Sequence, residues 1–227
     1  MDELTRAARL IDAIWGEQRI VTPALLRALA THGNPVIGAF HGDDLVGAQM
    51  GFLGMEEGRT ILHSHITGVA RGLEHRGLGL ELKRAQRDWC LGHGIDTVTW
   101  TFDPMVARNA YFNLVKLGAV ADRFHRDFYG EMEDDLNVGD RSDRLEVRWE
   151  LRSDRVEGAL AGSPREPSAV DRETVPVPED YHALRQRDPG EAARWRDSVA
   201  DTLEELFAKG YRATWFLREG VYVLEPA

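Results

Sequence analysis

Residues 60–79 read Thr60-Ile-Leu-His-Ser-His-Ile-Thr-Gly-Val-Ala-Arg-Gly-Leu-Glu-His-Arg-Gly-Leu-Gly79. The first half of this stretch is an alternating, partly β-branched run that predicts a strand over residues 59–69. A glycine-containing loop follows, and residues 78–92 have the composition of a helix. A strand, a glycine loop and a helix N-terminus in this order predict an anion-binding site. Glycine lets the backbone approach a ligand closely, and the first amides of a helix have no acceptor within the helix.

The loop over residues 74–79 differs from two common phosphate-binding patterns. It lacks the Gly-Lys-Ser/Thr ending of a P-loop and the GxGxxG spacing of a dinucleotide fingerprint. It resembles instead the pyrophosphate loop of the GNAT superfamily of acyl-CoA-dependent N-acyltransferases. That pattern, Gln/Arg-x-x-Gly-x-Gly/Ala, reads here Glu74-His75-Arg76-Gly77-Leu78-Gly79. Glu74 departs from it by replacing Gln or Arg, and the family binds phosphate there mainly through backbone amides.

A second segment, residues 103–119, resembles the other signature of this family, which runs Asn-x-x-Ala, then Tyr, then Lys-Leu-Gly-Phe. The positions that fit are Ala110, Lys116, Leu117 and Gly118. The family's tyrosine, which commonly protonates the leaving thiolate, falls on Leu114. Tyr111 lies three residues earlier on roughly the same helix face, where it is either the general acid or a core residue. The family's asparagine falls on Ala107, and Asn109 and Asn113 offer displaced amides.

The order of predicted elements matches the GNAT fold. Two helices come first, the second opening at Thr22-Pro23 and stopping at Gly33, and three strands lead to the glycine loop. The other predicted ranges are helices at 3–15, 78–92 and 105–117, and strands at 36–41, 45–54, 59–69, 95–102, 119–129 and 144–151. The resemblance implies an α/β (α+β) fold with a mixed, mostly antiparallel central sheet flanked by helices.

The composition divides the chain into three parts. Residues 1–151 form the GNAT-like core, and the proline-rich residues 152–180 predict a linker or a wrapped loop. Residues 181–227 predict a C-terminal extension, made of an amphipathic helix over 189–209 and a hairpin of strands 211–217 and 221–224. We expect this extension to pack on the core or on a second copy of the chain in a homodimer.

His63 and His65 stand two residues apart, so a regular strand places both on one face, together with Thr67 and Val69. A neutral imidazole near pH 7 suits the removal of a proton from an ammonium group. The pair resembles the His-x-His pair of the arylalkylamine N-acetyltransferases, which acts through water as the general base. The alternative is that they are sheet histidines bonded to backbone carbonyls. Zinc ligation is disfavoured because no Cys or acidic residue stands at a ligand spacing, and we expect no metal.

The resemblance implies an extended acyl-CoA co-substrate, acetyl-CoA or a larger donor such as succinyl-CoA. The end of the strand would pair with pantetheine through its backbone, and the loop amides would bind the pyrophosphate. Arg71 and Arg76 would add positive charge near the 3′-phosphate, or are solvated surface residues. The residues expected at the cofactor are Val69, Arg71, Glu74, His75, Arg76, Gly77, Leu78, Gly79, Leu80 and Asn109.

Arg108 lies near the start of the predicted helix over 105–117. A guanidinium there could bind a carboxylate through two parallel hydrogen bonds. This would favour an amino acid as acceptor, or a dicarboxylic acyl group on the donor. The alternative is a surface arginine.

The composition limits the classes of function. The chain has 227 residues and a formal net charge of −10, which disfavours nucleic-acid binding. No apolar run approaches the roughly 20 residues that span a bilayer, and the acidic N-terminus lacks a signal-peptide pattern, so we expect no membrane partner. The single cysteine, Cys90, fits a reducing cytoplasm. The basic residues are almost all arginines, as expected from a GC-rich bacterial genome.

These features predict an N-acyltransferase that transfers an acyl group from acyl-CoA directly to the primary amine of a small molecule, amino acids included. No covalent enzyme intermediate is needed. Two alternatives stay open from the sequence. One is a different CoA-thioester enzyme on the same fold, an O-acyltransferase or a decarboxylase. The other is a non-catalytic acyl-CoA-binding module.

Overall fold

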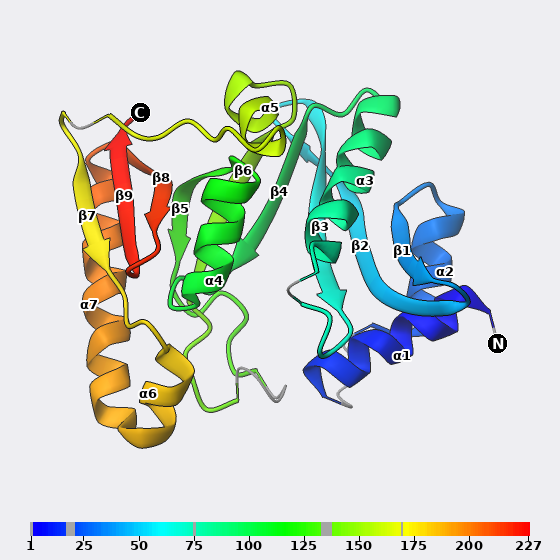
Figure 1. The fold of residues 1–227 in the computed structure, drawn as a ribbon, viewed down its shortest axis with the longest axis horizontal. Helices are drawn as coiled ribbons and strands as arrows, with labels where there is room; N and C mark the ends of the chain where they lie inside the picture. Colours follow the sequence, from blue (N-terminus) through cyan, green and yellow to red (C-terminus); the bar gives the residue numbers. More distant parts are fainter. Residues whose placement is uncertain (1, 17–20, 75, 133–137, 169) are drawn as a thin grey trace. The chain divides into compact units, whose positions relative to one another are not determined.

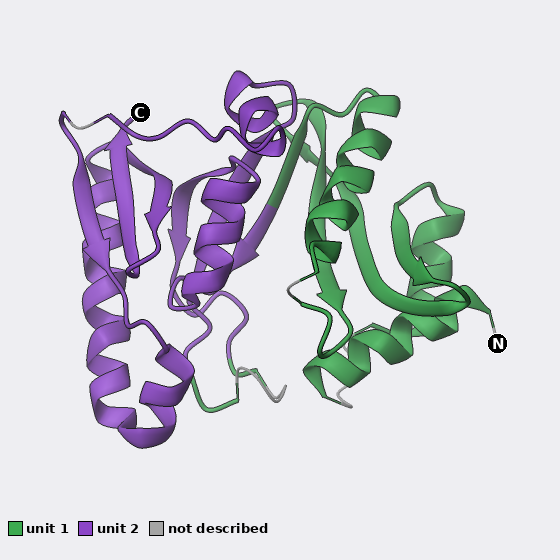
Figure 2. Ribbon diagram, in the orientation of Figure 1, with its two compact units in different colours: residues 1–99, 131–140 green, residues 100–130, 141–227 purple. Residues whose placement is uncertain are grey.

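The computed structural model describes residues 2–16, 21–74, 76–132, 138–168 and 170–227. The chain forms two compact units (Figure 2): unit 1 comprises residues 1–99 and 131–140, and unit 2 comprises residues 100–130 and 141–227. Strand β4 (Thr97–Phe102) begins in unit 1 and ends in unit 2.

Unit 1 is a sheet with three helices (Figure 1). Its strands are β1 (Val36–His41), β2 (Asp44–Glu56), β3 (Arg59–Val69) and the start of β4. They run in the order β1-β2-β3-β4, antiparallel from β1 to β3 and parallel between β3 and β4. Its helices are α1 (Glu3–Trp15), α2 (Pro23–Thr31) and α3 (Leu78–Gly92). The predicted order of elements is confirmed, and α3 begins and ends at the predicted residues.

The helices of unit 1 cover both faces of its sheet. Ile11 of α1 and Leu26 of α2 are buried with Met50 of β2 in one apolar cluster. On the other face Leu82 of α3 lies over Gly47, where a Cβ atom would come within 3.1 Å of the leucine side chain. The absence of a side chain at Gly47 therefore lets α3 approach the sheet closely.

Unit 2 contains the end of β4 and the remaining strands, in the order β4-β6-β5-β8-β9-β7. These strands are β5 (Val120–His125), β6 (Arg144–Glu150), β7 (Glu173–Pro176), β8 (Tyr211–Leu217) and β9 (Val221–Pro226). Its helices are α4 (Ala107–Ala110), the π-helix η1 (Tyr111–Lys116), α5 (Asp154–Leu160), α6 (Tyr181–Arg187) and α7 (Pro189–Ala208). Because β8 pairs with β5, the C-terminal hairpin continues the same sheet as β5 and β6.

The segment predicted as a linker or wrapped loop, residues 152–180, contains α5 and β7. These elements have only seven and four residues, too few to show a clear hydrophobic period in the sequence. Helix α6 was likewise not predicted. The domain boundaries at 151 and 180 stay a prediction, and the compact units divide instead after Thr99.

The predicted helix over 105–117 is two elements instead of one. It starts at Ala107 as α4 and continues as η1, where the Leu117 N–H donates to the Phe112 carbonyl, five residues back, at 3.0 Å. Gly118 ends it with a φ of 69°, as predicted, and a Cβ there would lie 2.8 Å from the Arg155 carbonyl oxygen. Turns of this wide type occur frequently at functional sites.

Candidate functional site

The predicted anion site is the loop that leads from β3 into α3. Gly77 is the N-cap of α3, has a φ of 81° and makes no side-chain capping bond, and the helix begins at Leu78. The N–H groups of Leu80 and Arg76 already donate to carbonyls within the loop, at 3.0 and 3.2 Å. The amides placed to bind an anion are therefore those of Gly77, Leu78 and Gly79, and the helix dipole adds positive potential there.

The side chains of the loop carry charges of both signs. Arg71, Glu74 and Arg76 are exposed, and Arg71 donates through Nη2 to the Ile14 carbonyl, at the C-terminal end of α1, at 3.3 Å. His75 lies outside the described residues. The arginines can supplement the loop amides with charge, whereas Glu74 opposes an anion at close range.

The end of β3 has a backbone edge suited to an extended ligand. The ladder between β3 and β4 comprises Leu62 with Val98 and His63 with Thr99, and it ends there. The remaining part of β3, up to Val69, has its ladder bonds on the β2 side. Such an edge can pair with the amides of an extended ligand as an added strand would.

A β-bulge changes the predicted arrangement of side chains on β3. Met50 of β2 pairs with Ile66, and the next residue, Gly51, pairs with Ser64, so His65 is the extra residue. The bulge reverses the alternation, which places His63 and Thr67 on opposite faces. The expectation that both histidines share one face with Thr67 and Val69 is therefore wrong, because it assumed a regular strand.

The two histidines nonetheless lie together, against Phe52 of β2. The ring centroid of Phe52 is 5.0 Å from that of His63 and 5.8 Å from that of His65, and the two imidazoles are 6.2 Å apart. His63 Nδ1 lies 3.4 Å from the Thr99 hydroxyl. Although His65 keeps an exposed surface, protein atoms displace water around its ring and lower the pKa of its imidazole below the usual 6.5. A neutral His65 at pH 7 is the protonation state that a general base needs.

A buried polar cluster lies on the α3 side of the same strand. Lys83 of α3 is 3% exposed, and its Nζ donates to the Ser64 hydroxyl at 2.9 Å and to Gln86 Oε1 at 3.2 Å. Gln49 Nε2 lies 3.4 Å from the same hydroxyl. Burial lowers the pKa of Lys83 from 10.5 to about 7. The sequence analysis missed this cluster, because Lys83 shares its helix face with Gln86 and no continuous apolar pattern marked that face as buried.

The described residues show neither a reactive thiol nor a cluster of metal ligands. Cys90 is buried, and burial raises the pKa of its thiol to about 12, so the nucleophilic thiolate is absent at neutral pH. The described residues contain no group of three or more His, Cys, Asp or Glu side chains that could hold a metal ion.

None of the described helices is long and apolar enough to cross a membrane.

Unit 2 holds the other predicted site residues. Tyr111 opens the π-helix, and its hydroxyl lies 3.4 Å from Nη2 of Arg218, whose guanidinium carbon is 5.3 Å from the tyrosine ring centroid. Asn109 donates its backbone N–H to the Val106 carbonyl at 2.9 Å. Leu114, at the position of the family's tyrosine, is fully buried and therefore belongs to the core.

Arg108 lines a cavity of about 530 Å³ in unit 2. The other lining residues come from the start of α4 and from the start of α6: Met105, Val106, Ala107, Glu179, Asp180, Tyr181 and His182. Arg108 is exposed, and the structure gives its guanidinium no hydrogen bond or ion pair with another described residue.

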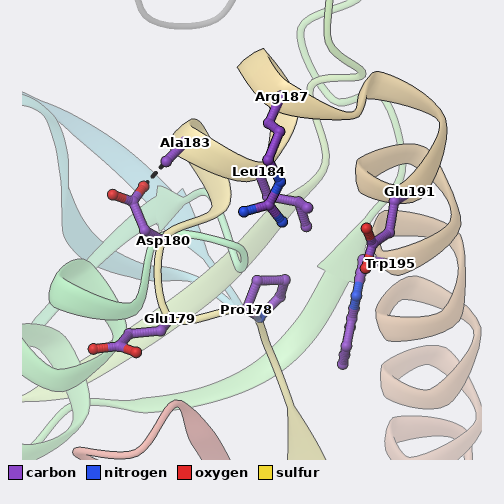
Figure 3. Close-up of a pocket in the computed structure, with 8 residues that line it drawn as sticks. All are labelled: Pro178, Glu179, Asp180, Ala183, Leu184, Arg187, Glu191 and Trp195. Atoms are coloured by element: carbon purple, nitrogen blue, oxygen red, sulfur yellow. Dashed lines mark hydrogen bonds between the residues drawn. The ribbon is translucent and has the colours of Figure 1, made fainter.

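A smaller cavity of about 300 Å³ adjoins it and shares Glu179 and Asp180 as a wall. Figure 3 shows its other side, where Glu191 lies next to Trp195 and the side chain of Arg187 lies beside Leu184. The carboxylates of Glu179 and Asp180 point away from Trp195 (Figure 3). We therefore assign these two charges to the larger cavity.

Comparison with solved structures identifies the fold. One similar structure is a predicted acetyltransferase of the GNAT family from Desulfovibrio desulfuricans, with a TM-score of 0.52 and 16% identity over 66% of this chain and 92% of that chain. A second is aminoglycoside 6′-acetyltransferase type Ii, with a TM-score of 0.52 and 13% identity; the match covers 66% of this chain and 90% of that chain. A third is the NatC complex bound to Gag peptide and CoA, with a TM-score of 0.50 and 14% identity; the match covers 66% of this chain and 92% of that chain. The protein has the GNAT fold. No protein-family model matches the sequence, and no curated protein matches it either.

This comparison confirms the predicted fold. Some residues around the predicted sites were nevertheless missed, because they lie far from those sites in the sequence. Arg218 lies beside Tyr111 although 107 residues separate the two in the sequence, and the start of α6 lines the same cavity as Arg108 although more than 70 residues separate them. A single sequence contains no local signal for such pairs.

Proposed function

We propose that this GNAT-fold protein is an acyl-CoA-dependent N-acyltransferase that acylates the primary amine of a small molecule, with acetyl-CoA as the first donor to test. The observation that supports this most is the β3–loop–α3 junction. Gly77 holds a left-handed conformation there, and the amides of Gly77, Leu78 and Gly79 open the helix. This geometry fits a pyrophosphate, and the edge of β3 up to Val69 fits the amides of pantetheine.

His63 and His65 are the proposed base. They lie beside the edge of β3, and the lowered pKa of His65 keeps it neutral at pH 7. One of them, directly or through water, takes a proton from the acceptor ammonium, which frees the amine lone pair to attack the thioester carbonyl. The C–S bond breaks, CoA leaves as a thiolate, and the nitrogen, now bonded to the acyl carbon, loses its second proton to water. Correct positioning of the two substrates supplies most of the rate, and a general base adds about 10²–10⁴-fold.

Tyr111 is the proposed acid. Its hydroxyl would return a proton to the departing thiolate, and Arg218, 3.4 Å away, can stabilise the phenolate that remains. Asn109 and Arg108 belong to the same turn and are proposed to contact cofactor and acceptor respectively.

The test is a turnover assay that detects both products. The purified chain is mixed with acetyl-CoA and a panel of primary amines. Free CoA is measured with a thiol reagent, and the acylated product is identified by mass spectrometry. We expect an N-acetylated amine. An ester product, or loss of carbon dioxide from a carboxylated donor, would establish a different CoA-thioester enzyme, and acyl-CoA binding without turnover would establish a binding module.

The matched variants separate the base from the fold. The double variant His63→Ala with His65→Ala is expected to lose about 10²–10⁴-fold in kcat while keeping acetyl-CoA binding. His41→Ala, a change of the same type at an exposed strand end, serves as the control. Because the pKa of His65 is lowered, the acidic limb of the kcat/KM profile should lie below pH 6.5. Undiminished turnover in the double variant would rule out the histidines as the base.

A further inference from the structure

The larger cavity in unit 2 is built by two segments that are far apart in the sequence. Residues 105–108 follow β4, and residues 179–182 lie at the start of α6, where the predicted linker meets the C-terminal extension. A volume of about 530 Å³ is within the range of small-molecule sites. The start of α6 therefore forms one wall of a ligand-sized cavity whose other wall carries Arg108.

A buried ion pair ties the two walls together. Arg196 of α7 is 3% exposed and donates to both carboxylate oxygens of Asp103, at 3.0 and 3.3 Å. Its Nε donates to the Tyr181 hydroxyl at 3.0 Å, and the Tyr222 hydroxyl donates to the Pro104 carbonyl at 2.7 Å. These bonds fix the turn before Met105 against the start of α6, so the cavity is formed in advance of any ligand.

The charges in this cavity do not neutralise one another. Arg108 faces the same space as Glu179 and Asp180, yet no ion pair joins it to either within the described part of the chain. Asp180 Oδ1 caps α6 by accepting the Ala183 N–H at 2.9 Å, which leaves Oδ2 to face a ligand. Charges of opposite sign that share a cavity without pairing suit a ligand that carries both signs.

We propose that this cavity binds the acceptor and that the acceptor is a free amino acid, with Arg108 on its carboxylate and Glu179 and Asp180 on an ammonium group. The role of this amino acid as acceptor rests on the proposed function, whereas its chemical class is inferred from the cavity alone. The apolar wall made by Met105 and Val106 would contact the amino-acid side chain.

Direct binding tests this without turnover. The full chain is titrated calorimetrically with the common L-amino acids, with and without CoA, and the tightest binder is compared with its carboxamide, which lacks the carboxylate. The variants are Arg108→Gln, and Glu179→Gln combined with Asp180→Asn, in which asparagine keeps the α6 cap. Arg187→Gln, in the smaller cavity only, is the matched control.

We expect at least one amino acid to bind, the carboxamide to bind about 10-fold to 100-fold more weakly, and Arg108→Gln and the acidic double variant to show losses of that order. Arg187→Gln should bind as the wild type does. The proposal is overturned if no amino acid binds at about 10 mM, if the carboxamide binds equally well, or if only Arg187→Gln loses binding. A chain that binds amino acids but not acetyl-CoA would overturn the proposed function alone, and the converse would overturn this proposal alone.

Discussion

The buried lysine of α3 makes the stability of the protein depend on pH in a way that one substitution should remove. Lys83 is 3% exposed, and burial lowers the pKa of its ammonium from 10.5 to about 7. Lys83→Met keeps a long unbranched side chain and removes the titrating group. The Ser64 hydroxyl and Gln86 lose their bonds to Nζ, which shifts the unfolding free energy by a similar amount at every pH.

The sign follows from proton counting. Between pH 7 and pH 10.5 the unfolded chain holds a proton on Lys83 that the folded chain has released. The unfolding free energy therefore rises with pH in this window, by at most about 1.4 kcal/mol per unit. From pH 7 to pH 9 the unfolding free energy rises by about 2 kcal/mol. The rise is less than the maximal slope would give, because near pH 7 about half of the folded molecules still hold the proton on Lys83. Above pH 9 the raised pKa of Cys90 acts in the opposite direction, so the window ends there.

The assay is urea unfolding followed by tryptophan fluorescence at several values of pH from 6 to 9. The quantity of interest is the difference between the wild type and Lys83→Met, which cancels the other titrating groups. This difference should change by about 2 kcal/mol between pH 7 and pH 9 and stay flat below pH 6. Lys116→Met, at an exposed lysine, should show no such change. A difference that stays constant within about 0.5 kcal/mol would show that Lys83 remains charged in the folded protein, and the reasoning would fail.

Three further predictions concern other parts of the structure. Asp103→Asn should lower the free energy of unfolding by about 3–5 kcal/mol, because it leaves the buried Arg196 without its counter-charge. Adding Arg196→Met should recover part of this loss, whereas additive shifts of the urea midpoint would contradict the ion pair. Gly77→Ala should lower the free energy of unfolding by about 1–2 kcal/mol and reduce acetyl-CoA binding, because the φ of 81° strains any residue with a Cβ. The cause is the backbone conformation and not a clash, since a Cβ there meets no atom within 4 Å, and an unchanged thermal midpoint would refute this argument. Tyr111→Phe should lower kcat about 10-fold or more with little change in KM, and Arg218→Gln should lower it less; equal kcat in all three proteins would exclude the acid role.

The elements with strong local signals were predictable from the sequence. Helix α3 is bounded by Gly77 and by the turn at His93, and the alternation over residues 59–69 gives β3 its bounds. The glycine loop was predictable for the same reason, since a left-handed residue before a helix favours glycine. These features depend on neighbours in the sequence, which one chain displays in full.

Features that depend on distant partners were not predictable. The bulge at His65 exists because of the register between β2 and β3, and it reversed the faces assumed for Thr67. The π-helix at Tyr111 and the short helices α5 and α6 likewise have no local period of their own. The cavity beside Arg108 joins segments more than 70 residues apart, so only the folded chain reveals it.

The central claim is that the loop from β3 into α3 binds acyl-CoA. The most direct measurement is thermal unfolding of the purified chain with and without excess acetyl-CoA, succinyl-CoA and free CoA. A ligand at about 100 times its dissociation constant adds about 2.7 kcal/mol of stability, which raises the midpoint by several degrees in a chain of this size. We predict such a shift, largest with the preferred donor and reduced in Gly77→Ala. An unchanged midpoint with all three compounds would contradict the account, and the loop at residues 74–80 would then be a structural turn.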